Sequence, residues 1–295
     1  MQYRAKLWTS LSAIALTAAT GVAASSLATP HHATASQAMP NQAKRGAVQL
    51  QAPWLQFADS GVASGEGGEG GQGGEGGEGG FDPTAAASDP TVFLSALDVI
   101  RAHYLAGLAV VGENREAAGE LFAHPISEVY VNLEPVFLTL GVAPFEDKMA
   151  ATVDLAYSDA DGDTVAAAAR QVLTALDAAE TKAPASVRSR LGVEADVLAE
   201  MIDRAALQYR YATESAEPGE AWLDGYGFYK TAQNRGAALL PQIENASAEA
   251  GEKVRAALDL LAEAYPSATP PADRPVTSGQ LLAASSNVKL QIGQL

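Results

Sequence analysis

The chain has 295 residues, no cysteine, four histidines and a formal net charge of −16 at pH 7. A polyanion of this kind repels nucleic acid and anionic lipid surfaces, so the charge argues against nucleic-acid binding and favours cations or basic partners. The absence of cysteine excludes disulfides, thiolate metal sites, c-type haem attachment and a lipid-anchored lipoprotein start. Because the chain is rich in alanine and only 6% aromatic, the composition favours helices.

Residues 1–35 have the pattern of a secretory signal peptide. Arg4 and Lys6 precede a mildly apolar run over residues 7–24, and Ala33-Thr34-Ala35 offers a cleavage site of small residues. A signal anchor is the alternative, but the run is short and weakly apolar for a stable span. No later stretch approaches 18 apolar residues, so no membrane insertion is expected after signal cleavage. The mature protein is expected to be periplasmic or secreted.

Residues 36–80 are predicted to be a disordered segment that ends in a tether rich in glycine and glutamate. Residues 65–80 read GEGGEGGQGGEGGEGG, a low-complexity tract with a period of three. So much glycine makes ordering entropically costly, and the tract has no apolar side chain to bury. A plain tether is the simpler interpretation, and a weak cation-collecting arm is the alternative.

Folded structure is predicted over residues 81–265, as an all-α bundle of about six to eight helices. Asp89 is a good N-cap and Pro90 suits the first helical position, so a helix is expected from there to about Gly112. A second helical run leads from Arg115 to the dipeptide His124-Pro125. Together these runs predict a helical hairpin with a polar turn.

Further helices follow at three- and four-residue apolar spacing. The segments are expected over residues 127–140, 144–156, 165–176, 193–214 and 254–265, with another long helix that opens over residues 220–229. Pro135 is expected to kink or break its helix, and Pro241 to interrupt another. Residues 266–295, with four prolines, are predicted to be a C-terminal tail in which residues 280–285 add at most a short turn.

His103 and His124 are the only histidines outside the leader, and they lie about ten residues on either side of the hairpin turn. With a rise of about 1.5 Å per residue, an antiparallel hairpin would bring the two rings level. Glu128 follows His124 by four residues, which is one helical turn if the helix continues past Pro125. Two imidazoles and a carboxylate at one level can hold a metal ion. The simpler alternative is a core histidine bonded to a carbonyl, with His124 as a cap.

Two other groups of residues invite a metal interpretation. The acidic turn at residues 159–163 lacks the glycine and glutamate that an EF-hand loop needs at its sixth and twelfth positions, so capping of the next helix explains it better. Tyr209 and Tyr211 could supply a phenolate ligand for iron. Tyrosines at helical spacing are more often core residues whose hydroxyl reaches water or a carbonyl, and that interpretation is favoured.

The arrangement of an early helical histidine with a later His124-Pro125-Ile126-Ser127-Glu128 segment resembles exported helical proteins of the imelysin and iron-uptake type. Imelysins carry Gly-x-His-x-x-Glu. Here Phe122 stands where the glycine would be, and the glutamate comes four residues after the histidine. The resemblance implies a helical domain outside the cytoplasm that handles metal.

Residues 209–228 resemble a helical hairpin in extracytoplasmic domains joined to high-affinity iron permeases. The motif there is Glu-Tyr-Gln-Asp-Ala-x-Gly-Phe, and in this chain its places are taken by residues 221–228. Asp224 and the pair Gly227-Phe228 match, while Ala221 stands in the place of the first carboxylate. The resemblance implies iron handling, with Asp224 as a ligand.

The first functional hypothesis is therefore an exported, non-catalytic metal-binding protein that serves as an accessory or uptake component. Its ligands would be His103, His124, Glu128 and Asp224, with iron the leading candidate and copper or zinc as alternatives. Its partners would be the ion and a membrane-bound uptake component. The second hypothesis is a helical interaction or scaffold module with no ligand. An enzyme of imelysin-like peptidase type is a third, but no catalytic motif supports it.

Overall fold

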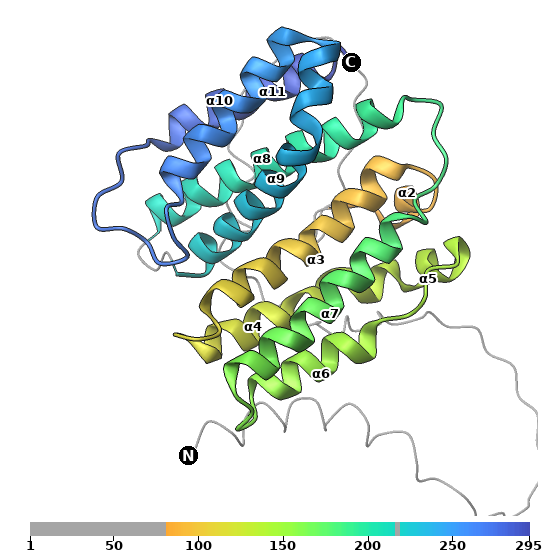
Figure 1. The fold of residues 1–295 in the computed structure, drawn as a ribbon, viewed down its shortest axis with the longest axis vertical. Helices are drawn as coiled ribbons and strands as arrows, with labels where there is room; N and C mark the ends of the chain where they lie inside the picture. The colour runs from red at the N-terminus through yellow and green to blue at the C-terminus, as the bar shows by residue number, and fades with distance from the viewer. Residues whose placement is uncertain (1–80, 216–218) are drawn as a thin grey trace, which may run out of the picture. The chain divides into compact units, whose positions relative to one another are not determined.

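The structure is a computed structural model, and it describes residues 81–215 and 219–295, all of them within one compact unit. The predicted signal peptide and tether lie outside the described residues. All regular elements in the described ranges are helical, which confirms the all-α prediction. In chain order they are α2 (Pro83–Ala86), α3 (Pro90–Val110), α4 (Arg115–Pro125), the π-helix η2 (Ile126–Tyr130), α5 (Val131–Leu140), α6 (Glu146–Ala156), α7 (Gly162–Glu180), α8 (Arg190–Glu214), α9 (Gly219–Ala246), α10 (Ala248–Ala264) and α11 (Ser278–Ile292) (Figure 1).

Helix α3 is the central element of the described part. Asp89 caps it by accepting a hydrogen bond of 2.8 Å from the Thr91 N–H, and Pro90 occupies the first turn, as the sequence predicts. Figure 1 shows α3 between α7 and the pair α8–α9, and it also packs against α4. Most of its residues are buried, because it contacts neighbours on several sides.

The length and composition of α3 correct the expectation that no stretch after the leader is long and apolar enough to cross a membrane. Among the described helices it alone meets that test, over Pro90–Val110. In the structure, 72% of its apolar window is buried inside the protein. A helix in the centre of a core is apolar on all sides because other helices cover it, so its composition also fits a core helix.

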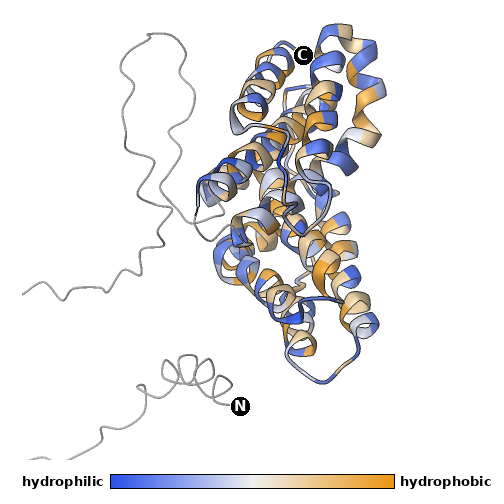
Figure 2. Cartoon of the chain, turned by 90° about the vertical axis from the view of Figure 1, so that its left-hand side faces the viewer, coloured by the Kyte–Doolittle hydropathy of each residue, from blue (hydrophilic) through white to orange (hydrophobic). Residues whose placement is uncertain are grey.

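The helices α8 and α9 form a long antiparallel pair, and α10 and α11 pack on them. Figure 2 shows apolar residues gathered on the faces where helices meet, with polar residues on the outward faces. The buried residues form one continuous cluster that includes residues from α2 through α11. A single core therefore holds both the hairpin of the two histidines and the α8–α9 pair.

Prolines interrupt the helices less than expected. Pro135 lies inside α5 and Pro241 inside α9, and both helices continue through them. A proline removes one intrahelical hydrogen bond, but the exposed Pro241 leaves Leu239 and Ile243 buried on the packed side of α9. Tertiary packing thus outweighs the local cost.

The prediction of a tail over residues 266–295 is wrong for residues 278–292, which form α11. Thr277 and Gln280 make a reciprocal capping box at its start. Leu281, Val288 and Ile292 are buried against α8 and α10. The apolar stripe is hard to recognise in the sequence because the buried Ser285 interrupts it; its hydroxyl donates to Asp203 at 2.6 Å.

Two of the alternatives are decided by hydrogen bonds. Asp161 caps α7 by accepting from the Thr164 N–H at 2.8 Å, and its hydrogen bonds with Thr164 lower the pKa of its carboxyl. The acidic turn is therefore a helix cap, as favoured. The buried Tyr209 donates its hydroxyl to the Val276 carbonyl at 2.8 Å, which is the core role expected for it.

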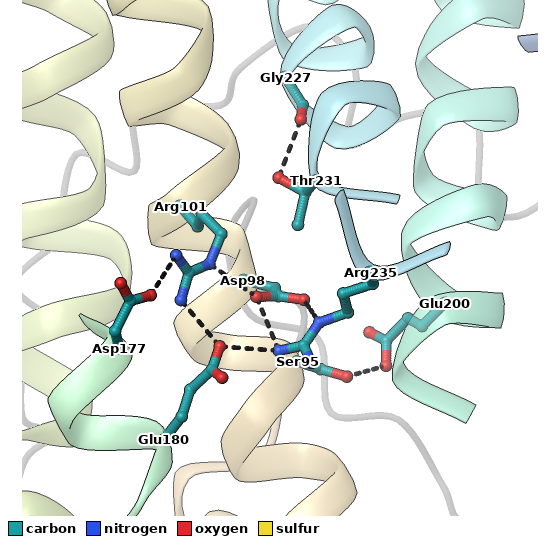
Figure 3. A network of polar contacts seen from close by, with 9 residues as sticks. All are labelled: Ser95, Asp98, Arg101, Asp177, Glu180, Glu200, Gly227, Thr231 and Arg235. Atoms are coloured by element: carbon teal, nitrogen blue, oxygen red, sulfur yellow. Dashed lines mark hydrogen bonds and ion pairs between the residues drawn. The ribbon is translucent and has the colours of Figure 1, made fainter. Parts of the chain in front are cut away.

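A buried charge network ties α3 to α7 and α9 (Figure 3). The Asp98 side chain, 0% exposed, accepts hydrogen bonds from Arg101 Nε at 3.2 Å and from Arg235 Nη2 at 2.9 Å. Glu180 of α7 accepts from both arginines, at 2.8 and 2.9 Å. Burial lowers the pKa of each arginine, but the facing carboxylates, Asp98 above all, raise it more, so both pKa values lie above the usual one. Both guanidinium groups therefore stay protonated, and each is paired with carboxylates of the network.

Candidate functional site

The hairpin of α3 and α4 brings the two histidines together. The ring centroids of His103 and His124 are 6.4 Å apart, with 71° between the ring planes. The expected proximity is therefore confirmed. The two helices can approach because Gly107 faces the Phe122 ring, and a Cβ at that glycine would overlap the ring.

His103 is held rigidly on the inner side of the site. Its side chain is 2% exposed, and Nδ1 lies 2.8 Å from the Val99 carbonyl oxygen one turn earlier in α3. Because a carbonyl can only accept, Nδ1 carries the proton that is donated, and in the neutral ring Nε2 is then the lone-pair nitrogen. That Nε2 lies 3.7 Å from Asp224 Oδ1. The edge-to-face Phe228 ring, with its centroid 6.4 Å away, supports the imidazole.

Asp224 is brought to His103 by a close crossing of α3 and α9. Gly227 lies so near the Ala102 carbonyl that a Cβ there would overlap its oxygen. Asp224, one turn earlier in α9, is 2% exposed. A buried carboxylate is costly unless a cation or hydrogen bonds compensate it, so its position beside an imidazole is chemically significant.

His124 forms the outer side of the site at the end of α4. Its side chain is 33% exposed, and Nδ1 lies 3.8 Å from Glu220 Oε1 in the first turn of α9. Glu220 is not among the ligands predicted from the sequence. Its spacing of four residues from Asp224 is a signal that could have found it, because that spacing places both side chains on one face of a helix.

Glu128 lies in η2, four residues after His124, and its Oε2 atom is buried. Pro125 has no N–H to continue the α-helical ladder, and the chain widens into a π-helical turn directly after it. Such turns occur frequently at functional sites. The helix therefore continues past Pro125, which was the condition for Glu128 to follow His124 along one helical path.

No protein-family model, curated protein sequence or solved structure matches the chain. The resemblance to imelysin-like and iron-permease-associated domains therefore stays a prediction. What the site can do has to be argued from its own geometry.

The geometry comes near to that of a metal site without reaching it. Among the described residues, no three histidine, aspartate or glutamate side chains are gathered closely enough to hold a metal ion. Two ligand atoms of one tetrahedral ion, each about 2.0–2.1 Å from the metal, lie about 3.3–3.4 Å apart. The His103–Asp224 and His124–Glu220 separations of 3.7 and 3.8 Å are only slightly wider. A contraction of about half an ångström in each pair would reach the ligand spacing.

The donor set fits a divalent transition metal. Imidazole nitrogens suit zinc, copper, iron and nickel, and a set of two histidines and one carboxylate is the common facial triad of non-haem iron. The hydrogen bond from His103 Nδ1 to a backbone carbonyl is what metal-bound histidines usually make with their second nitrogen. A core histidine paired with Asp224 would make the same bond, and the metal content of the protein distinguishes the two roles.

Proposed function

We propose that the protein binds a transition-metal ion between α3, α4 and α9, and that it does so without catalysing a reaction. Iron is the first candidate, with copper and zinc as alternatives. The observation that carries the proposal is the pairing of His103 with the buried Asp224, next to the pairing of His124 with Glu220. Glu128 is the further acidic ligand that the sequence suggests.

Charge supports the assignment. The carboxylates of Asp224 and Glu220 bring negative charge close to the two histidine rings. A bound cation would offset the cost of keeping Asp224 out of water, which an uncharged ligand could not do. The rigid placement of His103 by its carbonyl bond would lower the entropic cost of binding, because the ring is already oriented.

The cellular role is proposed from the sequence alone. The leader pattern favours a periplasmic or secreted protein, and the tract over residues 65–80 favours a tether. Such a protein could deliver metal to a membrane-bound uptake component or sense metal near it. Copurification of the tethered protein with membrane proteins, compared with a chain lacking residues 65–80, would test this role.

The direct test is the metal content of the full, untagged chain after purification. We expect about one ion per chain, lost in the double variant His103→Ala/His124→Ala. The variant Glu252→Gln is the control, because it removes an exposed carboxylate of α10 and leaves the site intact. Circular dichroism of both variants would show whether each is folded. Equal metal content in the two folded variants would contradict the proposal.

A helical interaction module without a ligand is the second candidate, and one observation favours it. On α5, Val131 is 51% and Leu138 84% exposed, and these apolar side chains lie seven residues apart on one face. A partner captured equally well with and without a chelator, and lost in Leu138→Glu, would support this function. Loss of the partner on chelation would favour metal binding instead.

A further inference from the structure

Helix α9 presents two carboxylates to the hairpin of α3 and α4, one to each histidine. Asp224 faces His103 and Glu220 faces His124, with separations that differ by only 0.1 Å, at 3.7 and 3.8 Å. The spacing of four residues is one turn of the helix, so the two acids follow the two rings along the same direction. The site therefore consists of two similar histidine–carboxylate pairs.

The two pairs differ sharply in their access to solvent. Both side chains of the His103–Asp224 pair are 2% exposed, whereas His124 is 33% and Glu220 66% exposed. A hydrated ion in solution can therefore meet the His124–Glu220 pair directly. It can reach the inner pair only after it has shed water, because both side chains there are buried.

The position of Glu220 suits a capture role. It lies in the first turn of α9, where the partial positive charge of the helix terminus favours a carboxylate. Its exposed side chain retains the rotamer freedom to meet an ion outside and follow it inward, which the buried Asp224 lacks.

We propose that Glu220 is a metal ligand at the mouth of the site, where with His124 it captures the ion and transfers it to His103 and Asp224. This inference rests on the proposed metal-binding function. It adds Glu220, which is not among the ligands predicted from the sequence. It also assigns the two pairs separate tasks. Glu220 governs the association rate of the ion, and Asp224 governs its dissociation rate.

The test measures Co²⁺ binding to the full, untagged chain by stopped-flow absorbance, with Glu220→Gln, Asp224→Asn and Glu252→Gln. Glu252→Gln is the matched control, because it removes one carboxylate of α10, and the Glu252 side chain is 73% exposed. A charge at the rim of a binding surface acts mainly on the association rate, and a buried one on the dissociation rate. We expect Glu220→Gln to lower the association rate constant by about three- to tenfold relative to Glu252→Gln.

Asp224→Asn is expected to raise the dissociation rate by about tenfold or more while association changes less. If Glu220→Gln matches Glu252→Gln in association rate, the inference is overturned, although metal binding by the inner pair would stand. The inference is equally overturned if Glu220→Gln acts only on dissociation. If the unmodified chain binds no Co²⁺, the proposed function and this inference fall together.

Discussion

The two buried polar clusters that join α3 to α9 are built in opposite ways. In the network around Asp98, guanidinium groups of α3 and α9 bridge carboxylates of α3 and α7 at 2.8–3.2 Å, with directional hydrogen bonds (Figure 3). About one and a half helical turns further along α3, His103 and Asp224 stand 3.7 Å apart, beyond hydrogen-bond distance. The first cluster is satisfied by its own members, whereas the second has the spacing that an added ion would bridge.

This difference indicates separate roles for the two clusters. Charges that compensate one another hold the helices together and leave nothing for a ligand to do. Carboxylates and imidazoles near ligand spacing instead offer the donor atoms that a metal ion uses. The network should therefore govern stability, and the histidine cluster should govern binding.

The largest effect is expected from Arg235→Met in the network. Its loss leaves the fully buried Asp98 with less compensation, and removal of one partner of a buried ion pair typically costs about 3–5 kcal/mol. The free energy of unfolding in urea measures it. The double variant Asp98→Leu/Arg235→Met should recover at least half of the loss. A loss below about 1 kcal/mol in the single variant would contradict a structural role for the network.

A smaller effect is expected from Gly227→Ala, which lies between the two clusters along α9. The new methyl group would press on the Ala102 carbonyl and push α9 away from α3, at a cost of about 1–3 kcal/mol. Metal binding should weaken as well, because Asp224 would move from His103. Gly279→Ala in α11 is the control, since nothing lies within 4 Å of its Cβ position. Equal stability of the two variants would contradict the close crossing.

Alkaline pH should lower the stability through the buried tyrosines rather than through the arginines of the network. Burial raises the pKa of the Tyr104 and Tyr265 hydroxyls above the usual 10.0, while the pKa values of Arg101 and Arg235 are raised too. The unfolded chain therefore loses tyrosine protons first. Stability should be complete below pH 10 and fall above it, by about 1.4 kcal/mol per pH unit for each tyrosine.

The measurement is urea unfolding between pH 9 and 11.5. Tyr104→Phe should make the decline above pH 10 less steep, because that hydroxyl no longer titrates in the unfolded chain. A decline that is equally steep in Tyr104→Phe would show that other groups cause it.

The smallest stability effect is expected from Asp224→Asn. Without metal, the change in the free energy of unfolding should stay within about 1 kcal/mol, because asparagine keeps the shape of the side chain and the network around Asp98 is unchanged. Metal affinity should nevertheless fall by about 10- to 100-fold. Urea unfolding in the presence of a chelator measures the free energy of unfolding without metal, and titration with Zn²⁺ measures the metal affinity. A large loss of stability with unchanged affinity would assign Asp224 to a structural ion pair like that of the network.

Local signals were sufficient for much of the fold. The cap at Asp89 with Pro90, the cap at Asp161 and the apolar spacing along α8 each depend on neighbours within a few residues, and the structure has them as predicted. The continuation of α9 through Pro241 and the formation of α11 depend instead on packing against distant helices. Such packing leaves little trace in a short window of sequence.

In the candidate site, too, local sequence signals predicted some features, and contacts between distant residues determine the others. The symmetric spacing of His103 and His124 about a turn is a local signal, and it predicted their proximity. Which acids face them is set by the crossing of α9 over α3 at Gly227, a contact between residues more than a hundred positions apart. Glu220 was missed for this reason. Asp224 was included only through the resemblance to permease-associated domains.

The most direct measurement of the central claim is ¹⁵N NMR of the full chain labelled at histidine, titrated with Zn²⁺. We expect the resonances of His103 and His124 to shift together and saturate at about one ion per chain, with Nε2 of His103 bound and Nδ1 still protonated. If the His103 and His124 resonances do not move at saturating Zn²⁺, the two histidines are not metal ligands.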